Sequence, residues 1–149
     1  MTLRRGGSLI SKIHQVSGRV FNRILLEEGI GEINSAQGRI LFALWDEDNV
    51  PISTLAKKTM LDKSTLTGML DRLEKDGFIA RAPSSGDRRV ILITRTDKDK
   101  TLQKKYLAVS GRMTDIFYKK FSKSDIDRFE DMLSMVLDNC IEEEKKARP

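Results

Sequence analysis

The sequence has few of the residues that metal centres, disulfide frameworks and many catalytic sites require. Its 149 residues include one histidine, His14, one cysteine, Cys140, and one tryptophan, Trp45. One cysteine cannot form a disulfide within the chain, which agrees with a reducing compartment, and no cluster of histidine and cysteine is present to hold a metal. A phosphate-binding glycine loop and a Ser-His or Cys-His motif are missing too. We therefore expect neither an enzyme nor a protein with a metal or cofactor.

Long apolar runs are also missing. The longest has only a few residues, whereas a membrane-spanning helix needs about 20. The basic N-terminus leads into an amphipathic stretch rather than the apolar core of a signal peptide. We therefore expect a cytoplasmic protein with no membrane partner. With 39% hydrophobic and 33% charged residues, the composition favours a helical protein, either one compact domain or a small core domain with helices added at both ends.

The formal net charge of +5 is unevenly distributed. Residues 1–23 carry five basic groups and no acid, and residues 24–56 carry six acids and one base. Residues 57–95 carry nine bases and five acids, and residues 96–149 are nearly balanced. The positive charge is therefore concentrated at the N-terminus and in the middle of the chain, which hints at a polyanionic partner.

Apolar residues at helical spacing predict four helices before a β-hairpin and two after it. The first four helices are expected over residues 9–25, from a cap at Asn34 or Ser35 to the acidic residues 46–48, over a short segment opened by Pro51, and from the cap Asp62 to about Asp76. Residues 78–81 and 90–93 are the expected strands, with a turn over 83–86. Thr96 then caps a long helix, and Ser122 or Ser124 caps the last one, before a frayed, charged tail after Glu142.

Two short helices followed by a hairpin form a winged helix. We predict a mainly α-helical fold with a small β-hairpin wing, in which a winged helix-turn-helix over residues 34–96 is embedded in an all-helical dimerisation region, residues 1–33 and 97–149. The long helices outside the winged helix carry apolar stripes that so small a domain cannot cover. A second copy of the chain is the simplest surface for them.

The fourth predicted helix is the first candidate for a contact with DNA. The helical wheel places an apolar set on the core side: Leu66, Met69, Leu70 and Leu73. It turns a small and polar set outward: Ser64, Gly68, Asp71, Arg72 and Lys75, flanked by Thr65 and Thr67. Hydroxyls at the N-terminal end of such a face can bond to bases and phosphates in a major groove, and the helix dipole attracts a phosphate. The alternative is that Ser64 and Thr65 merely start a helix and that Arg72 is solvated.

The tip of the hairpin is the second candidate. It carries Ser84, Ser85, Asp87, Arg88 and Arg89. An arginine on a thin projecting loop can reach a narrow minor groove, where the potential is most negative. We expect Asp87 to pair with Arg89 across the turn and to fix the direction of its side chain. A generic solvated turn explains the serines equally well, but it explains the Asp-Arg-Arg cluster less well.

Together these segments resemble the MarR family of bacterial and archaeal transcriptional regulators. The resemblance is carried by Leu55-Ala56, by residues 62–67 and 70–79, by Asp87-Arg88-Arg89 and by Thr96 ahead of a helix. Its specific part spans residues 52–104, and its strongest signal is the Asp-x-Arg of the wing after the Leu-Glu-Lys-Asp-Gly helix end. Two positions depart from the family. Gly68 stands where a long polar or basic side chain is common, and Met60 stands in a turn where glycine is frequent.

The resemblance implies a homodimer that reads a pseudo-palindromic duplex operator with two winged helices. It implies DNA contacts by Ser64, Thr65, Thr67 and Arg72 from the recognition helix and by Arg88 or Arg89 from the wing. Lys63, Ser84, Ser85 and Asp87 complete the set of candidate DNA-binding residues. Most such proteins repress transcription, and they release DNA when a small, often phenolic or anionic compound binds between the dimerisation and DNA-binding regions.

His14 and Trp45 lie on helices that the family places around the effector pocket, and they are the candidate effector-binding residues. The alternatives are a structural histidine and a core or interface tryptophan. Cys140 lies on the apolar stripe of the last helix, and we expect it to be buried and inert. The resulting hypothesis is a dimeric, effector-released repressor. The alternative is a winged-helix protein-interaction module with no specific DNA site.

Overall fold

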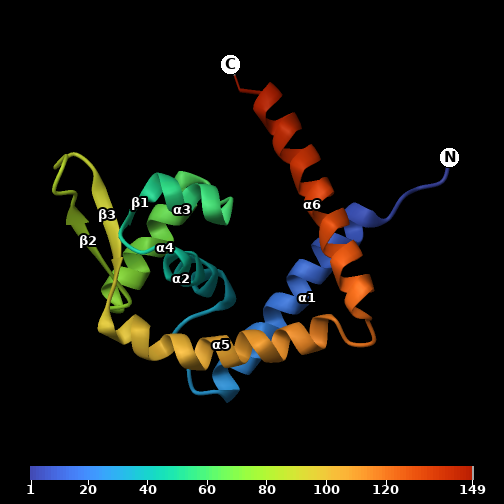
Figure 1. Cartoon of the computed structure of the whole chain (residues 1–149), viewed down its shortest axis with the longest axis horizontal. Helices are drawn as coiled ribbons and strands as arrows, with labels where there is room; N and C mark the ends of the chain where they lie inside the picture. Colours follow the sequence, from blue (N-terminus) through green and yellow to red (C-terminus); the bar gives the residue numbers. More distant parts are fainter. Residues whose placement is uncertain (149) are drawn as a thin grey trace. The chain divides into compact units, whose positions relative to one another are not determined.

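The computed structural model describes residues 1–148, and Pro149, at the end of the predicted segment 97–149, lies outside the described residues. Its elements follow in this order: α1 (Gly6–Glu27), α2 (Ser35–Asp46), β1 (Val50–Pro51), α3 (Ile52–Thr59), α4 (Lys63–Lys75), β2 (Ile79–Pro83), β3 (Ile91–Arg95), α5 (Asp97–Phe117) and α6 (Lys123–Lys146). Figure 1 shows a mainly helical chain with one small sheet, which confirms the predicted fold class. Within residues 1–148, no helix combines the length and the apolar character needed to cross a membrane.

The chain forms two compact units, Met1–Gly111 and a second one from Arg112 onward. The first unit contains α1 to α4, the sheet and most of α5, and the second contains the end of α5 and all of α6. The division of the chain into a winged helix over 34–96 and a dimerisation region over 1–33 and 97–149 concerns function, and it stays a prediction.

A capping box begins α2. The Asn34 side chain accepts a hydrogen bond from the Gln37 N–H at 2.9 Å, and the Gln37 side chain accepts one from the Asn34 N–H at 3.0 Å. Asn34 is therefore the cap, and Ser35 is the first residue of the helix. The Ser35 N–H donates to Asn22 Oδ1 of α1 at 2.8 Å, so the start of α2 is also held by the preceding helix.

Aromatic rings join α1, α2 and α5 in the core of the first unit. The Tyr106 ring lies 5.5 Å from Phe21 and 5.1 Å from Trp45, measured between centroids. Gly38 permits this approach, because a Cβ atom there would lie 2.2 Å from the Tyr106 hydroxyl oxygen. Burial raises the pKa of Tyr106 to about 12, so the phenol stays neutral in the core.

The helix-turn-helix is built as the sequence pattern predicts, with one residue in a costly conformation. Leu66, Leu70 and Leu73 of α4 are fully buried, whereas Met69 is half-buried. Met60 ends α3 in the left-handed region, at φ 57° and ψ 20°. This is the backbone that a glycine would adopt there most easily, so the methionine leaves the geometry of the turn intact.

The wing belongs to a three-stranded antiparallel sheet with the order β1-β3-β2. The strands of the hairpin lie one to two residues further along the chain than predicted, and β3 extends to Arg95, which pairs with Ile79. The strand β1, whose Val50 pairs with Ile93, was not predicted. A strand of two residues has no measurable periodicity, and only the free edge of β3 makes it a strand.

The first turn of α5 holds the end of α4. The Thr96 hydroxyl donates to the Gly77 carbonyl at 2.6 Å and accepts from the Asp99 N–H at 3.3 Å, so Thr96 caps α5 as predicted. Lys98 Nζ donates to the Asp76 carbonyl at 2.8 Å and lies 4.5 Å from the centroid of the Phe78 ring. These contacts fix the point at which the chain leaves α4 for the wing.

The second unit decides one alternative and corrects two expectations. Ser122 is the one of the two predicted caps that begins α6, and the predicted frayed tail after Glu142 is instead helical to Lys146. Ion pairs four and three residues apart, Glu144 with Arg148 and Glu143 with Lys146, stabilise this last turn, and the basic residues there suit the helix dipole. Cys140 is exposed, not buried, because α6 has no buried residue in the single chain.

Gly68 offers a test of how α4 is stabilised. A Cβ atom at this position would meet nothing within 4 Å, and alanine is favoured over glycine in a helix interior by about 1 kcal/mol. We expect Gly68→Ala to raise the free energy of unfolding by about 1 kcal/mol, measured by chemical denaturation with circular dichroism. Gly38→Ala is the control, which should destabilise the fold because of Tyr106. A lower stability for Gly68→Ala would contradict this account.

Candidate DNA-binding surface

The N-terminal end of α4 is organised around one carboxylate. Asp62 Oδ1 accepts hydrogen bonds from the Thr65 N–H and the Ser64 hydroxyl, each at 2.8 Å, and Asp62 Oδ2 accepts one from the Thr65 hydroxyl at 2.8 Å. These hydrogen bonds lower the pKa of Asp62 to about 2. The largest effect comes from the Thr65 N–H, and the next from the Ser64 hydroxyl. The hydroxyl protons of Ser64 and Thr65 therefore point back to the cap, and their oxygens remain free to accept hydrogen bonds.

Thr67 and Lys63 differ in how far they are available to a partner. The Thr67 hydroxyl donates to the Lys63 carbonyl at 2.7 Å, and its side chain is half-buried, so this residue mainly serves its own helix. Lys63 is exposed at the first position of α4, and its ammonium group has no ion-pair partner within the described chain.

An arginine on the neighbouring strand neutralises the acids of α4. Arg81 Nη1 of β2 lies 2.7 Å from Asp71 Oδ1 and 3.2 Å from Glu74 Oε1. Arg81 is half-buried and joins α4 to the wing. The helical wheel predicted that Asp71 faces outward, and no role was predicted for Arg81. The contact depends on the turn that folds β2 back along α4, which a local pattern does not reveal.

The tip of the wing is closed by backbone and side-chain hydrogen bonds. The Ser84 N–H donates to the Val90 carbonyl at 2.8 Å, and the Val90 N–H donates to the Asp87 carbonyl at 3.0 Å. Asp87 Oδ1 accepts from the Arg89 N–H at 3.0 Å and from Arg89 Nε at 3.3 Å, which confirms the predicted pair. The Arg89 side chain is 91% exposed, so this pair orients the side chain without burying it.

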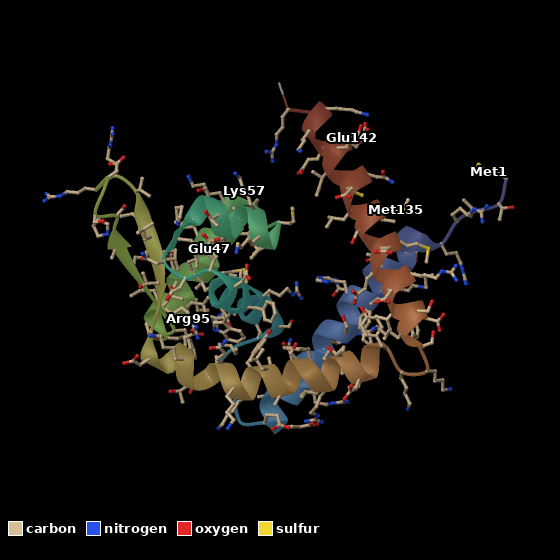
Figure 2. All side chains as sticks on the ribbon, in the orientation of Figure 1. Met1, Glu47, Lys57, Arg95, Met135 and Glu142 are labelled. Carbon is tan, nitrogen blue, oxygen red and sulfur yellow. The ribbon has the colours of Figure 1, made fainter. Side chains whose placement is uncertain are left out.

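Figure 1 shows β2 and β3 running to a tip at the end of the hairpin opposite to the foot of β3, where Figure 2 labels Arg95. Arg88 is exposed at this tip, and Ser85 is exposed beside it, whereas Ser84 is half-buried. Several cations of α3, α4 and the wing form no ion pair within residues 1–148: Lys57, Lys63, Arg72, Lys75 and Arg88. Four acids of these elements, Asp62, Asp71, Glu74 and Asp87, are bound by neighbouring groups, so α3, α4 and the wing carry an excess of unpaired positive charge.

The two candidate effector residues lie in different surroundings. Trp45 is half-buried and lines an open pocket of about 250 Å³, together with Phe42, Asp46, Gln103 and Leu107. His14 is exposed on α1 and does not line this pocket. Among the described residues, no three side chains of histidine, cysteine, aspartate or glutamate gather as they would around a metal ion.

Residues 33–91 match the model of the MarR family. A curated relative, the transcriptional regulator TtmR of Methylorubrum extorquens, is 33% identical over 88 residues, which cover 59% of this chain and 44% of the relative. The organic hydroperoxide resistance transcriptional regulator of Bacillus subtilis is 30% identical over 98 residues, covering 66% of this chain and 65% of the relative. The chain thus spans about half to two thirds of the length of these relatives.

The fold also matches solved structures. The structure of a cysteine-to-serine mutant of MarR from E. coli complexed with operator DNA superposes with a TM-score of 0.79 at 26% identity. The superposition covers 88% of this chain and 92% of that chain. The family match falls on the winged helix, and the structural match extends to the helices on either side of it. The winged helix of this chain is thus similar to the MarR family in sequence, and the fold of the chain is similar to that of MarR.

Proposed function

We propose that the chain is a homodimeric transcriptional repressor that binds one specific duplex DNA sequence, with α4 in the major groove and the tip of the wing in the adjacent minor groove. The observation that carries this proposal is the pattern of charge pairing. Asp71 and Glu74 are bound by Arg81, whereas Lys63, Arg72 and Arg88 have no ion-pair partner within residues 1–148. Cations without an ion-pair partner on a helix-turn-helix and its wing are available to bind the phosphate groups of DNA.

The relatives support the same function. Those named above are transcriptional regulators, and the MarR structure at 26% identity is described as complexed with operator DNA. None of these names denotes an enzyme, and we propose no catalytic activity for this chain. A regulator works where the DNA is, so the proposal places the protein in the cytoplasm.

Hydrogen bonding to Asp62 limits what the start of α4 can read. Ser64 and Thr65 donate their hydroxyl protons to this carboxylate, so towards DNA their oxygens can act only as acceptors. The donors in a major groove are the exocyclic amino groups of adenine and cytosine. The contacts of these two residues therefore favour adenine or cytosine, and phosphate contacts fall to Lys63 and Arg72.

A second copy of the chain covers the apolar stripes in this proposal. The stripe on α6 comprises Phe129, Leu133, Val136, Leu137 and Cys140. These residues recur at helical spacing, and large apolar side chains are seldom left in water over such a length without a partner. Two copies place two winged helices on the DNA and match a pseudo-palindromic site.

A small effector completes the proposal. Trp45 lines the open pocket of about 250 Å³ next to Phe42 and Leu107, and these apolar walls suit a flat phenolic compound. His14 does not line this pocket, so its part in effector binding would require the second copy.

The experiment that tests this function is selection of bound sequences from a random duplex pool at about 0.15 M salt, followed by quantitative binding. We expect an inverted repeat, and an affinity that falls with salt with a log-log slope of about 0.9 per phosphate neutralised. Recovery of no motif would contradict the proposal and favour a protein-interaction module, which has no preferred DNA site.

The wing makes a separate prediction. Arg88→Ala and Arg89→Ala should each weaken binding to the selected sequence several-fold, because an arginine is lost from the minor groove, while helicity stays unchanged. Fluorescence anisotropy with labelled duplex measures the affinity, and circular dichroism measures the helicity. Arg148→Ala, which removes an exposed arginine far along the sequence, is the control. If both wing variants bound like the parent chain, the wing would not contact DNA.

The dimer is tested by two substitutions on α6, the helix on which Figure 2 labels Met135. Helical spacing places Leu133 within the apolar stripe and Met135 on the opposite side, between Asp131 and Asp138. We expect Leu133→Lys to yield monomers in sedimentation equilibrium, because it puts a charge into the interface. Met135→Lys should remain dimeric. Equal behaviour of the two variants would rule out this stripe as the interface.

A further inference from the structure

A fully buried carboxylate lies at the junction of three elements and takes no part in the DNA contacts proposed above. Asp99 of α5 has no exposed surface. Its two oxygens accept hydrogen bonds from Trp45 Nε1 of α2 at 2.9 and 3.0 Å. Arg95 Nε of β3 donates to Asp99 Oδ2 at 2.5 Å. The carboxylate thus joins α2, the end of the wing and α5.

Arg95 is the residue that connects this carboxylate to the wing. It is the last residue of β3 and pairs with Ile79 of β2. Its guanidinium also donates to Gln103 Oε1 at 2.7 Å and lies 5.9 Å from the centroid of the Trp45 ring. Its backbone N–H donates to Asp48 Oδ1 at 2.9 Å. Both the main chain and the side chain of Arg95 are therefore fixed.

We call Asp99, Trp45, Arg95 and Gln103 the Asp99 cluster. Two of its members, Trp45 and Gln103, also line the pocket of about 250 Å³. A molecule that occupies this pocket would touch the direct hydrogen-bond partners of Asp99 and of Arg95. The pocket and the foot of the wing thus share side chains, with no intervening residue.

The wing amplifies a small movement at its foot. A strand rises about 3.3 Å per residue, so the tip near Arg89 lies about 20 Å along β3 from Arg95. Over that length, a rotation of about 5° displaces the tip by nearly 2 Å, by simple geometry. The donor–acceptor distance of a hydrogen bond varies by only a few tenths of an ångström, so such a displacement breaks a hydrogen bond between the tip and DNA.

We propose that Arg95 is a positioning residue for the wing, held by Asp99 and Gln103, and that the pocket controls the direction of the wing through these shared side chains. The inference rests on the proposed function and adds the route by which the pocket and the DNA contact are coupled. The opposing interpretation is that the Asp99 cluster only stabilises the fold, in which case its loss would affect every element that it touches.

Hydrogen exchange of the free protein tests the first step without DNA. Asp99→Asn keeps the shape of the side chain and removes its charge, so the hydrogen bond from Arg95 weakens. We expect faster exchange confined to the amides of residues 81–93, with α1 unchanged. Val109→Ala is the control, because it removes buried volume from α5 without touching Arg95. Equal or uniform acceleration in both variants would overturn the proposal.

A double-mutant cycle on the selected DNA sequence tests the consequence. Asp99→Asn should lower the affinity several-fold in the parent chain and have no further effect once Arg88 and Arg89 are both alanine, because the wing then makes no contact to lose. Additive losses would overturn the positioning role. Gln103→Leu removes only one hydrogen bond to Arg95 and should show the same non-additivity, which keeps the test valid if Asp99→Asn does not fold.

The two experiments separate the inference from the function on which it rests. If the parent chain selects no DNA sequence but the exchange of residues 81–93 still rises in Asp99→Asn, the proposed function fails and the structural coupling stands. If the parent chain selects a sequence and the cycle is additive, the function stands and the positioning role fails. The emission of Trp45, the single tryptophan, reports directly whether each variant retains the Asp99 cluster.

Discussion

The position of the wing depends on one constraint, the need to pair a buried carboxylate. A buried charge without partners costs several kcal/mol, so the Asp99 side chain must lie where Trp45 and Arg95 can both reach it. Replacing such a cluster by apolar groups is often neutral or stabilising, which means that its main effect is to specify one arrangement. Here the arrangement that it specifies is the meeting of α2, β3 and α5. The Tyr106 contact with Gly38 brings α2 and α5 close enough for that meeting.

Local chemistry made much of the chain predictable. The caps Asp62 and Thr96 were predicted, and Asn34 was one of two candidates, from residue type and from the start of an apolar repeat, because a cap forms hydrogen bonds within three residues of itself. The pairing of Asp87 with Arg89 was predictable for the same reason. The order of the helices and the hairpin followed from changes in periodicity. Each of these inferences uses only neighbours in the sequence.

The contacts that the sequence did not reveal join distant segments. The cap at Thr96 includes one contact that was predictable and one that was not. An acidic residue three positions after a threonine cap can accept a hydrogen bond from the backbone N–H of the cap. Here the Asp99 carboxylate instead accepts from Trp45, which is 54 positions away. The pairing of Arg81 with Asp71 and the strand β1 have the same origin, since both exist only after the chain has folded back.

Cys140 was predicted to be buried because its stripe is apolar, yet burial of that stripe needs a surface that one chain does not supply.

Two residues conflict with local preference, and both belong to the helix-turn-helix. Met60 holds a left-handed backbone that glycine would adopt with less strain, and Gly68 occupies a helix interior that favours alanine. Nothing in residues 1–148 accounts for either choice, since Met60 is 61% exposed and a Cβ atom on Gly68 would meet nothing within 4 Å. Proteins tend to depart from local rules at functional sites. Both departures flank Ser64 and Thr65, so they adjoin the surface that we propose to contact DNA.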